Sequence, residues 1–277
     1  MTSRRNRIPA CTAGPTGEPG PALPASGART ERASLDKSSA RIRSMFDGLA
    51  GRYDLLDRLF SLGLDGVWRR KAVRALGLRP GDRVLDVATG TGELARVALD
   101  MAPGAQVVGL DFALEMLRRG RDKLAAMPIG DPARPSPAFV PAAGDALRLP
   151  FPDGSFDAVM IAYGLRNTAD SERALDEFRR VLDPDGKLLV LEFGLPRSPV
   201  LRGLFRWYFH RLMPRVAGWS FGHREPFAYL AASVEAYPDA PALAALMTRH
   251  GFLHERTLEL TFGISHALIA RATGPAR

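Results

Sequence analysis

The segment DRVLDVATGTGE, residues 82–93, limits the folds open to this chain more than any other stretch. Its apolar run VLDV suits a short buried strand. Gly90 and Gly92 follow at once, and because glycine lacks a Cβ they permit positive φ and let a ligand approach the backbone closely. The composition of residues 93–101 is helical. The sequence therefore predicts a strand, a tight glycine turn and a helix in direct succession.

An acid inside this motif indicates what kind of ligand the turn accepts. The first amides of the predicted helix lack partners within it and point into the turn, which suits a carboxylate or a phosphate. Asp86 would repel a bound pyrophosphate but suits a ligand with a positive end. S-adenosylmethionine carries an ammonium, a sulfonium and a carboxylate but no phosphate, so the stretch favours a methyl-donor site over a nucleotide site or a structural turn. The candidate donor-binding residues of the turn are Asp86, Thr89, Gly90, Thr91 and Gly92.

Acidic residues follow the next two predicted strands, at the edge where open α/β sheets bind ligands. Asp111 comes directly after the strand at residues 106–110, about 20 residues beyond the turn, where a carboxylate can accept ribose hydroxyls. A helix N-cap is a compatible second role for it. Asp145 and Ala146 follow a third strand near residues 138–140, and Asp145 can accept from an adenine amino group. The alternative for Asp145 is a turn aspartate.

The run GLRN follows a fourth predicted strand, residues 155–163. Arg166 and Asn167 lie in this run, at the carboxyl end of the strand, where their side chains can face a substrate. A salt bridge and a helix cap are the alternatives for these two residues.

The remaining elements predict the fold class. A helix over residues 170–182, a turn at 184–186 and a fifth strand over 187–193 follow the fourth strand. Two late apolar runs, residues 257–260 and 266–270, have the spacing of a hairpin that closes one side of the sheet. The sequence therefore predicts an α/β, doubly wound and mostly parallel seven-stranded sheet with a C-terminal antiparallel hairpin.

The flanking segments predict the organisation of the chain. Residues 1–34 are rich in Pro, Gly, Ala, Ser and Thr and should form a disordered tail, whereas residues 35–277 should form a single domain. A proline-rich loop is expected over residues 128–141. Helical segments over residues 35–78 and 199–240 are expected as a cap and a lid over the pocket. The second mixes arginine with aromatic residues, so a membrane-surface contact or a slot for an apolar tail is also open.

Composition and charge narrow the function further. The net charge of +8 is consistent with a generally basic surface. More specific interpretations are a surface that binds nucleic acid and one that binds an anionic membrane. No nucleic-acid methylation motif follows the fourth strand, and no apolar run approaches the roughly 18–20 residues of a membrane span. The single cysteine, Cys11, and five scattered histidines give no metal-ligand spacing. We expect a cytoplasmic protein without metal or nucleic acid, with peripheral membrane contact as an open alternative.

Taken together, these motifs resemble the demethylmenaquinone/ubiquinone C-methyltransferases, a class I S-adenosylmethionine-dependent family with a Rossmann-like fold. The resemblance runs from Met45 to Ala272 and includes MFDGLAGRYDLL, SLGLDGVWRRK, VLDVATGTGELA, YGLRNTAD and AYLAASVEAYPDAPAL. Many methyltransferases share the glycine-turn motif. The GLRN run and the tyrosine-bearing last segment narrow the match to this family.

The resemblance implies methyl transfer from S-adenosylmethionine to a ring carbon of a prenylated hydroquinone. The expected acceptor is demethylmenaquinol in menaquinone biosynthesis, with 2-polyprenyl-6-methoxy-1,4-benzoquinol of ubiquinone biosynthesis as a second. The family's donor contacts fall on Thr91, Asp111, Asp145 with Ala146, and Ala162. The family often has serine at the last position, and alanine there leaves only a backbone contact.

The resemblance also implies roles around the acceptor ring. Arg166 would stabilise a phenolate, while Asn167 and Tyr53 would orient the ring oxygens. A charged arginine is a poor base, so a water would carry the proton. Core packing is the alternative for Tyr53 and for Trp68. Two rival functions are a methyltransferase acting on another small molecule and a donor-binding accessory subunit of a quinone-biosynthesis complex; a homodimer is a further expected assembly.

Overall fold

The structure of the protein is a computed structural model that describes residues 61, 63–126, 139–208, 211 and 225–274. The predicted tail, most of the N-terminal helical cap with Tyr53, and most of the predicted loop at residues 128–141 lie outside the described residues.

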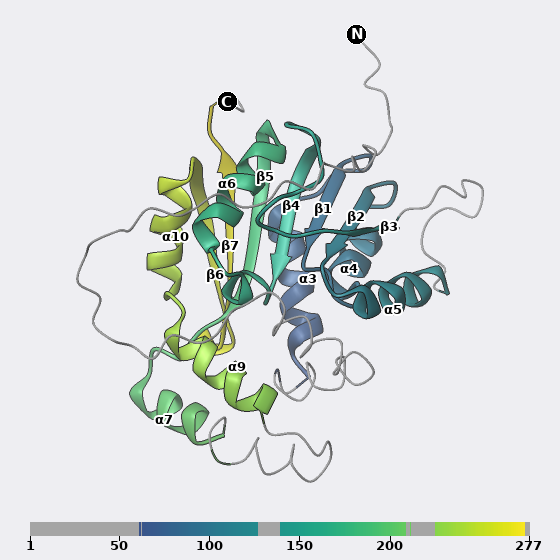
Figure 1. Ribbon diagram of the computed structural model, residues 1–277. Helices are drawn as coiled ribbons and strands as arrows, with labels where there is room; N and C mark the ends of the chain where they lie inside the picture. The colour runs from purple at the N-terminus through teal and green to yellow at the C-terminus, as the bar shows by residue number, and fades with distance from the viewer. Residues whose placement is uncertain (1–60, 62, 127–138, 209–210, 212–224, 275–277) are drawn as a thin grey trace, which may run out of the picture.

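Seven strands form one sheet in the order β3-β2-β1-β4-β5-β7-β6 (Figure 1). The pairs from β3 through β5 are parallel, and β7 runs antiparallel to both β5 and β6. The strands are β1 (Arg83–Val87), β2 (Gln106–Asp111), β3 (Phe139–Ala143), β4 (Phe156–Ala162), β5 (Leu182–Phe193), β6 (Phe252–Leu260) and β7 (Ser265–Ala272). The predicted doubly wound sheet with its C-terminal hairpin is confirmed.

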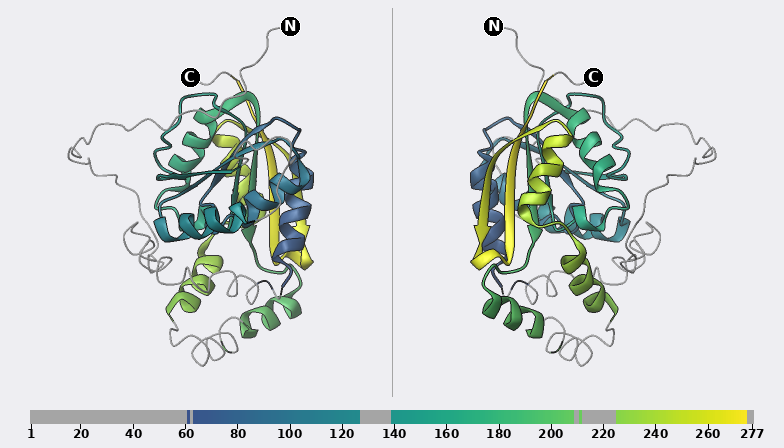
Figure 2. Two further views of the ribbon diagram at one scale, coloured as in Figure 1. Left: turned by 90° about the vertical axis from the view of Figure 1, so that its right-hand side faces the viewer. Right: turned by 90° about the vertical axis from the view of Figure 1, so that its left-hand side faces the viewer.

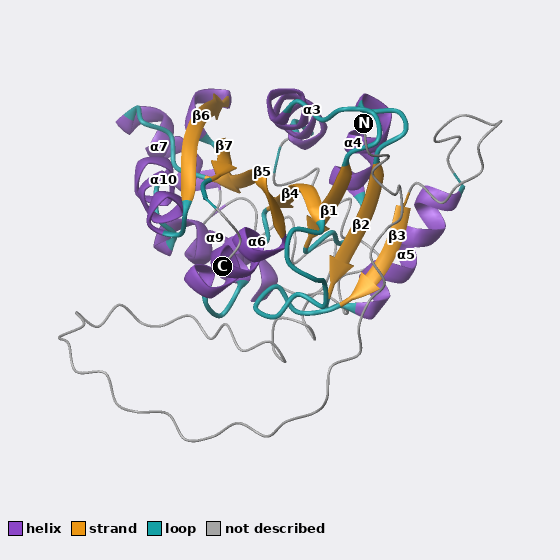
Figure 3. Cartoon of the chain, turned by 90° about the horizontal axis from the view of Figure 1, so that it is seen from above, coloured by secondary structure: helices purple, strands orange, loops and turns teal. Residues whose placement is uncertain are grey.

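Helices cover both faces of the sheet (Figure 3). One face packs against α3 and α4 through a buried cluster that includes Trp68 and Leu94, and the other packs against α6 and α10 through a cluster that includes Phe178 and Met247. The helices among the described residues are α3 (Asp65–Leu76), α4 (Glu93–Met101), α5 (Leu114–Ala125), η1 (Leu165–Asn167), α6 (Ser171–Val181), α7 (Pro199–Trp207), α9 (Glu225–Ala236), α10 (Ala240–Arg249) and η3 (Thr261–Gly263).

The core interpretation of Trp68 is confirmed. Trp68 on α3 is 2% exposed, and its indole Nε1 donates to Thr261 Oγ1 at 2.8 Å. Its ring packs edge-on against Phe193, with ring centroids 6.3 Å apart. The helix ends at Gly77, whose φ of 69° is in the left-handed region that suits glycine.

Strand β5 begins earlier than predicted. Leu182 pairs with Phe156, and Lys187 pairs with Ala158. Five steps along β5 therefore correspond to two steps along β4. The sequence predicted a separate turn at residues 184–186, before the strand. This prediction is wrong, because these residues form an irregularity within β5.

Strand β3 extends beyond the predicted loop boundary. Pro141, which was expected in the loop, pairs with Gly109 of β2. A proline has no N–H to donate, but β3 is the outermost strand on this side of the described sheet, and edge strands tolerate proline.

The carboxyl ends of the parallel strands meet at one end of the sheet. The glycine turn after β1, the loop after β3 and η1 after β4 come together there. Figures 1 and 2 show α9 and α7 beyond this end, with α7 farthest from the sheet. Of the helices that the structure describes, none is both long and apolar enough to cross a membrane.

Candidate active site

A pocket opens at the carboxyl ends of β1, β2 and β4. Its walls come from the glycine turn, the end of β2, the loop after β3 and the junction of β4 with η1. The structure brings six of the predicted site residues to these walls: Gly90, Asp111, Asp145, Ala146, Ala162 and Asn167.

Asp111 shapes the glycine turn and borders the pocket at the same time. Its Oδ2 accepts from the Gly90 amide at 2.8 Å, and its Oδ1 accepts from the Ala113 amide at 2.9 Å, just before α5. Gly90 has a φ of 57°, and the nearest atom to a Cβ built there is Met116 Cε at 3.4 Å. This arrangement forms a cradle in which a ligand can lie against the backbone.

Asp86 supports the turn from below and does not line the pocket. The side chain is 1% exposed, and its Oδ2 accepts from Thr89 Oγ1 at 2.6 Å and from the Ala95 amide at 3.2 Å. Burial raises the pKa of Asp86 to about 7, against the opposing effect of these two hydrogen bonds. In the structure, Asp86 and Thr89 therefore stabilise the conformation of the turn.

Thr91 and Gly92 lie behind the turn, against α5. A Cβ on Gly92 would lie 2.8 Å from Leu124 Cδ1. A Cβ on Gly120 of α5 would lie 3.1 Å from the carbonyl carbon of Thr91 and 3.2 Å from the carbonyl oxygen of Gly90. Backbone packs directly on backbone here, so α5 sets the position of the turn.

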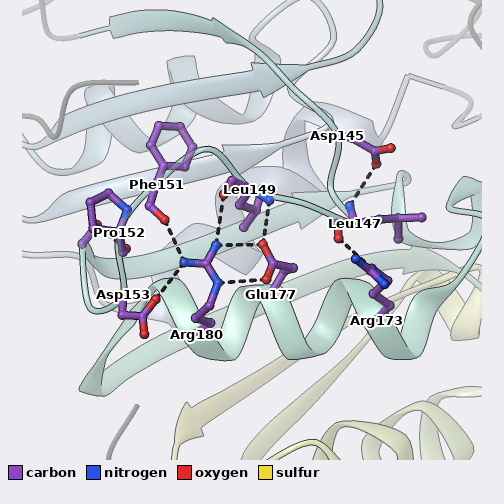
Figure 4. A network of polar contacts seen from close by, with 10 residues as sticks. Asp145, Leu147, Leu149, Phe151, Pro152, Asp153, Arg173, Glu177 and Arg180 are labelled. Atoms are coloured by element: carbon purple, nitrogen blue, oxygen red, sulfur yellow. Dashed lines mark hydrogen bonds and ion pairs between the residues drawn. The ribbon is translucent and has the colours of Figure 1, made fainter. Parts of the chain in front are cut away.

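Asp145 is exposed at the start of the loop after β3 (Figure 4). Its Oδ1 accepts from the Leu147 amide at 2.9 Å, and the Leu147 carbonyl accepts from Arg173 Nε at 2.9 Å. Asp145 therefore makes the turn contact that was its alternative role, in a position that also borders the pocket.

Asn167 faces the pocket with its amide held at both ends. Its Nδ2 donates to the Tyr163 carbonyl at 3.2 Å, and its Oδ1 accepts from Tyr229 Oη of α9 at 3.3 Å. These two contacts determine which end of the amide donates and which accepts.

Arg166 lies behind the pocket wall rather than on it. It is 5% exposed, and its Nη1 donates to Glu192 Oε2 at 2.8 Å and to the Tyr163 carbonyl at 2.5 Å. Its backbone amide donates to Glu192 Oε1 at 3.2 Å. Glu192, which is 2% exposed, therefore balances the guanidinium charge inside the protein.

Sequence reasoning missed several pocket residues. Phe112 and Met116 form apolar wall, and Tyr163 lines the pocket with a φ of 57°. Tyr163 stacks on Phe193, with ring centroids 4.3 Å apart. The available signal for Glu192 was a single acid in the apolar strand KLLVLEF, which predicts a buried partner.

The charges of the pocket select among ligand classes. Among the described lining residues, Asp111 and Asp145 are the charged ones, and none is lysine, arginine or histidine. In the described part of the chain, no group of His, Cys, Asp and Glu side chains could hold a metal ion. Phosphates would lack a neutralising partner on these walls, whereas hydroxyl and amino donors would find acceptors. The pocket suits a methyl donor better than a nucleotide.

The strand order with an antiparallel β7 and the pocket at the carboxyl ends of the strands define a class I methyltransferase fold. A solved S-adenosylmethionine-dependent methyltransferase from Aquifex aeolicus matches with a TM-score of 0.55 at 16% identity, covering 87% of this chain and 100% of that one. The pyocyanin biosynthetic protein PhzM matches with a TM-score of 0.59 at 22% identity, covering 82% and 62%. At these identities the likeness shows the fold.

The model of the ubiE/COQ5 methyltransferase family matches residues 34–271. The demethylmenaquinone methyltransferase of Thermus thermophilus is 48% identical over 221 residues, 80% of this chain and 96% of that relative. The ubiquinone/menaquinone biosynthesis C-methyltransferase UbiE of Citrifermentans bemidjiense is 40% identical over 233 residues, 84% and 96%. The chain belongs to the ubiE/COQ5 methyltransferase family and is an S-adenosylmethionine-dependent methyltransferase, which confirms the sequence prediction.

Proposed function

We propose that this protein methylates a ring carbon of a prenylated hydroquinone, with demethylmenaquinol as its main acceptor and 2-polyprenyl-6-methoxy-1,4-benzoquinol as a second. The names of the two relatives support this acceptor class. The observation that carries the proposal is the pairing, in one pocket, of carboxylates on one side and a fixed asparagine amide on the other.

The carboxylate side would hold the donor. Asp111 would accept the ribose hydroxyls and Asp145 the adenine amino group, while Gly90 lets the donor lie close to the backbone. Ala146 and Ala162 border the same space and would make backbone contacts. When bound, S-adenosylmethionine supplies a methyl group on a positively charged sulfur.

The other candidates of the turn act indirectly in this proposal. Asp86 and Thr89 stabilise the turn through their hydrogen bond. Thr91 and Gly92 pack against α5, so the position of α5 determines the position of the turn. Their substitution would alter donor affinity through the shape of the turn.

The asparagine side would hold the acceptor. The second N–H of the Asn167 amide can donate to a ring oxygen, and this stabilises the phenolate that makes the ring carbon nucleophilic. Tyr229 comes from α9, part of the predicted lid at residues 199–240, so the lid helps to orient this amide. We assign Arg166 a positioning role, because its pairing with Glu192 fixes η1. Tyr53, outside the described residues, keeps its proposed role toward the second ring oxygen.

The proton of the hydroquinone would leave through water. Arg166 is buried, but its pairing with Glu192 favours the charged guanidinium, which is unsuited to accept a proton. The acceleration would come mainly from holding the ring carbon and the methyl group in line, which ordered walls on both sides favour.

The proposal is tested with labelled S-adenosylmethionine and chemically reduced demethylmenaquinone, beside the reduced benzoquinone acceptor. Product from demethylmenaquinol alone supports a menaquinone enzyme, and product from both supports a dual function. Donor binding without product from either acceptor contradicts the proposal and favours another small-molecule acceptor or an accessory subunit. Asn167→Ala serves as a control that should lose turnover while it retains donor binding.

We further propose that the protein is cytoplasmic and contacts the membrane surface through an apolar patch formed by Val200, Leu204, Trp207 and Phe262. These side chains are 79%, 59%, 55% and 71% exposed. The first three lie on α7, and the fourth lies on η3, in the turn between β6 and β7. Figure 2 shows α7 beyond the same end of the sheet as this turn. Exposed apolar side chains in a cluster mark an interaction surface, and a prenylated acceptor resides in the membrane.

Ion pairs connect α7 and the residues just before it to neighbouring elements of the domain. Arg197, just before α7, pairs with Glu259 at the end of β6 at 3.2 Å, and Arg206 of α7 pairs with Glu235 of α9 at 3.0 Å. Co-sedimentation with phosphatidylglycerol/phosphatidylcholine vesicles should fall for Trp207→Ser while donor binding stays unchanged. Unchanged sedimentation, together with a dimer in light scattering that Trp207→Ser dissociates, would replace the membrane by a second copy of the chain.

A further inference from the structure

One face of α6 binds the backbone of the loop that forms the donor side of the pocket (Figure 4). Arg173, Glu177 and Arg180 lie four and three residues apart, so they share a face of the helix. Arg173 Nε donates to the Leu147 carbonyl at 2.9 Å, and Glu177 Oε2 accepts from the Leu149 amide at 2.6 Å.

Arg180 makes the largest share of these contacts. Its Nη2 donates to the Leu149 carbonyl at 3.0 Å, and its Nη1 donates to the Phe151 carbonyl and to Asp153 Oδ1, both at 2.8 Å. Its Nε and Nη2 also donate to the two carboxylate oxygens of Glu177, both at 2.8 Å. The planar guanidinium is therefore held in one orientation by a two-point contact with Glu177 while it binds the loop.

The loop residues that α6 binds alternate along the chain, at positions 147, 149, 151 and 153. The intervening Pro150 and Pro152 have no N–H and a fixed φ, which restricts the conformations of this stretch. Leu149 and Phe151 are each 4% exposed, so their side chains enter the core while their carbonyls turn to α6. Side chains of α6 thus donate hydrogen bonds to the loop carbonyls, as the backbone of a neighbouring strand would do in a sheet.

The contacts continue to the pocket wall. The Leu147 amide donates to Asp145, and Asp145 with Ala146 and Leu147 lines the pocket. Burial alone would raise the pKa of Glu177, but the hydrogen bonds from Arg180 and the Leu149 amide lower it, so the carboxylate that orients Arg180 is charged at neutral pH.

We propose that Arg180, oriented by Glu177, is a positioning residue for donor binding, which fixes the loop so that Asp145 faces the adenine amino group. This inference rests on the proposed function, because it takes Asp145 as the adenine partner. It predicts that the loss of Arg180 changes donor affinity and base selectivity more than it changes turnover at saturating donor.

Arg179 provides a matched control on the same helix. Its Nη2 donates to the Thr273 carbonyl at 2.8 Å, and its Nε to the same oxygen at 3.3 Å. Arg179→Gln therefore removes arginine–carbonyl hydrogen bonds next to Arg180, but these contacts hold the C-terminal segment and not the loop.

The experiment is calorimetry on the full-length protein with S-adenosylhomocysteine and S-inosylhomocysteine, in which the adenine amino group is replaced by oxygen. Arg180→Gln and Arg180→Lys should each raise the Kd for S-adenosylhomocysteine by about tenfold, since lysine keeps the charge but lacks the fork. The preference for adenine over hypoxanthine should fall toward one. The KM for the donor should rise with kcat within about twofold, and Arg179→Gln should leave the Kd unchanged.

Unchanged affinity and selectivity in Arg180→Gln would overturn the proposal, as would full recovery by lysine or an equal loss in Arg179→Gln. Glu177→Gln carries the same test if Arg180→Gln does not fold, because it loosens the guanidinium while leaving it in place. A wild-type protein that does not bind S-adenosylhomocysteine at all would contradict the proposed function itself. A wild-type protein that binds it with no adenine preference would contradict the assignment of Asp145.

Discussion

Gly164→Ala should destabilise the protein, and Ala88→Gly should restore most of that loss. The two residues follow the adjacent strands β4 and β1 and both line the pocket. A Cβ on Gly164 would lie 2.7 Å from Ala88 Cβ. Gly164 has φ −107° and ψ −34°, which any residue adopts without penalty, so the cost of a methyl group there is steric.

The expected magnitude follows from the same geometry. Ordinary carbon contacts begin near 3.4 Å, so a contact of 2.7 Å requires a shift of several tenths of an ångström, and overpacking of this kind costs about 1–3 kcal/mol. Ala88 has a φ of 52°, a left-handed conformation that costs a non-glycine residue about 1 kcal/mol. Ala88→Gly alone should therefore be close to neutral, and in the double variant it should remove the clash, leaving a tighter contact with Ile161 Cγ1 at 3.2 Å.

Urea unfolding of the four proteins measures the coupling between the two sites. We expect a coupling free energy of about 1–2 kcal/mol, well above the ~0.5 kcal/mol scatter of independent sites. Gly203→Ala on α7 is the control, because a Cβ there meets no atom within 4 Å and should combine additively with Ala88→Gly. A Gly164→Ala variant as stable as the wild type, or an additive cycle, would refute the steric reasoning.

Three further substitutions test separate parts of the site. Since burial raises the pKa of Asp86 to about 7 while the unfolded chain titrates near 4, the contribution of Asp86 to the free energy of unfolding should fall by about 3 kcal/mol as the pH rises from 4 to 7, and urea titrations across that range should lose this component in Asp86→Asn. Gly120→Ala places a methyl group 3.1 Å from the Thr91 carbonyl carbon, so donor affinity by calorimetry should fall about tenfold; equal affinity would show that α5 does not set the turn. Tyr229→Phe frees one end of the Asn167 amide, so kcat should fall about fivefold with the donor KM unchanged in steady-state kinetics; a change in the donor KM instead would place Tyr229 on the donor side.

The part of the pocket that we propose to hold the donor was predictable because its determinants are local. The glycine turn and the carboxylates after β2 and β3 are read from short segments whose strand ends must meet at one edge of a parallel sheet. Asp86 shows the limit of that reasoning. Along β1, Val84 and Asp86 point to the face covered by α3 and α4, and Leu85 and Val87 point to the other, so the acid lies under a helix and not in the pocket.

The part that we propose to hold the acceptor was harder to predict because it depends on local helical geometry and on distant residues. Arg166 and Asn167 are neighbours in sequence, but in a 3₁₀ helix successive side chains point about 120° apart, so the two do not face the same way. Their partners differ: Arg166 bonds Glu192, 26 residues away along the chain, and Asn167 bonds Tyr229, 62 residues away. No pattern in the sequence states that these residues meet.

Two walls of the pocket, the end of β4 and the loop after β3, are held in place by different contacts. Substitutions near the two walls should therefore have different effects. At the end of β4, the carbonyl of Tyr163 accepts from both Arg166 and Asn167, in a residue whose left-handed φ costs about 1 kcal/mol or more. Such strain persists only where the surroundings over-determine the backbone, as the buried pair of Arg166 with Glu192 does here. The donor wall is instead a loop held from one side by α6. Substitutions of Arg166 or Glu192, behind the end of β4, should therefore lower turnover. Substitutions on the face of α6 that binds the loop should lower donor affinity.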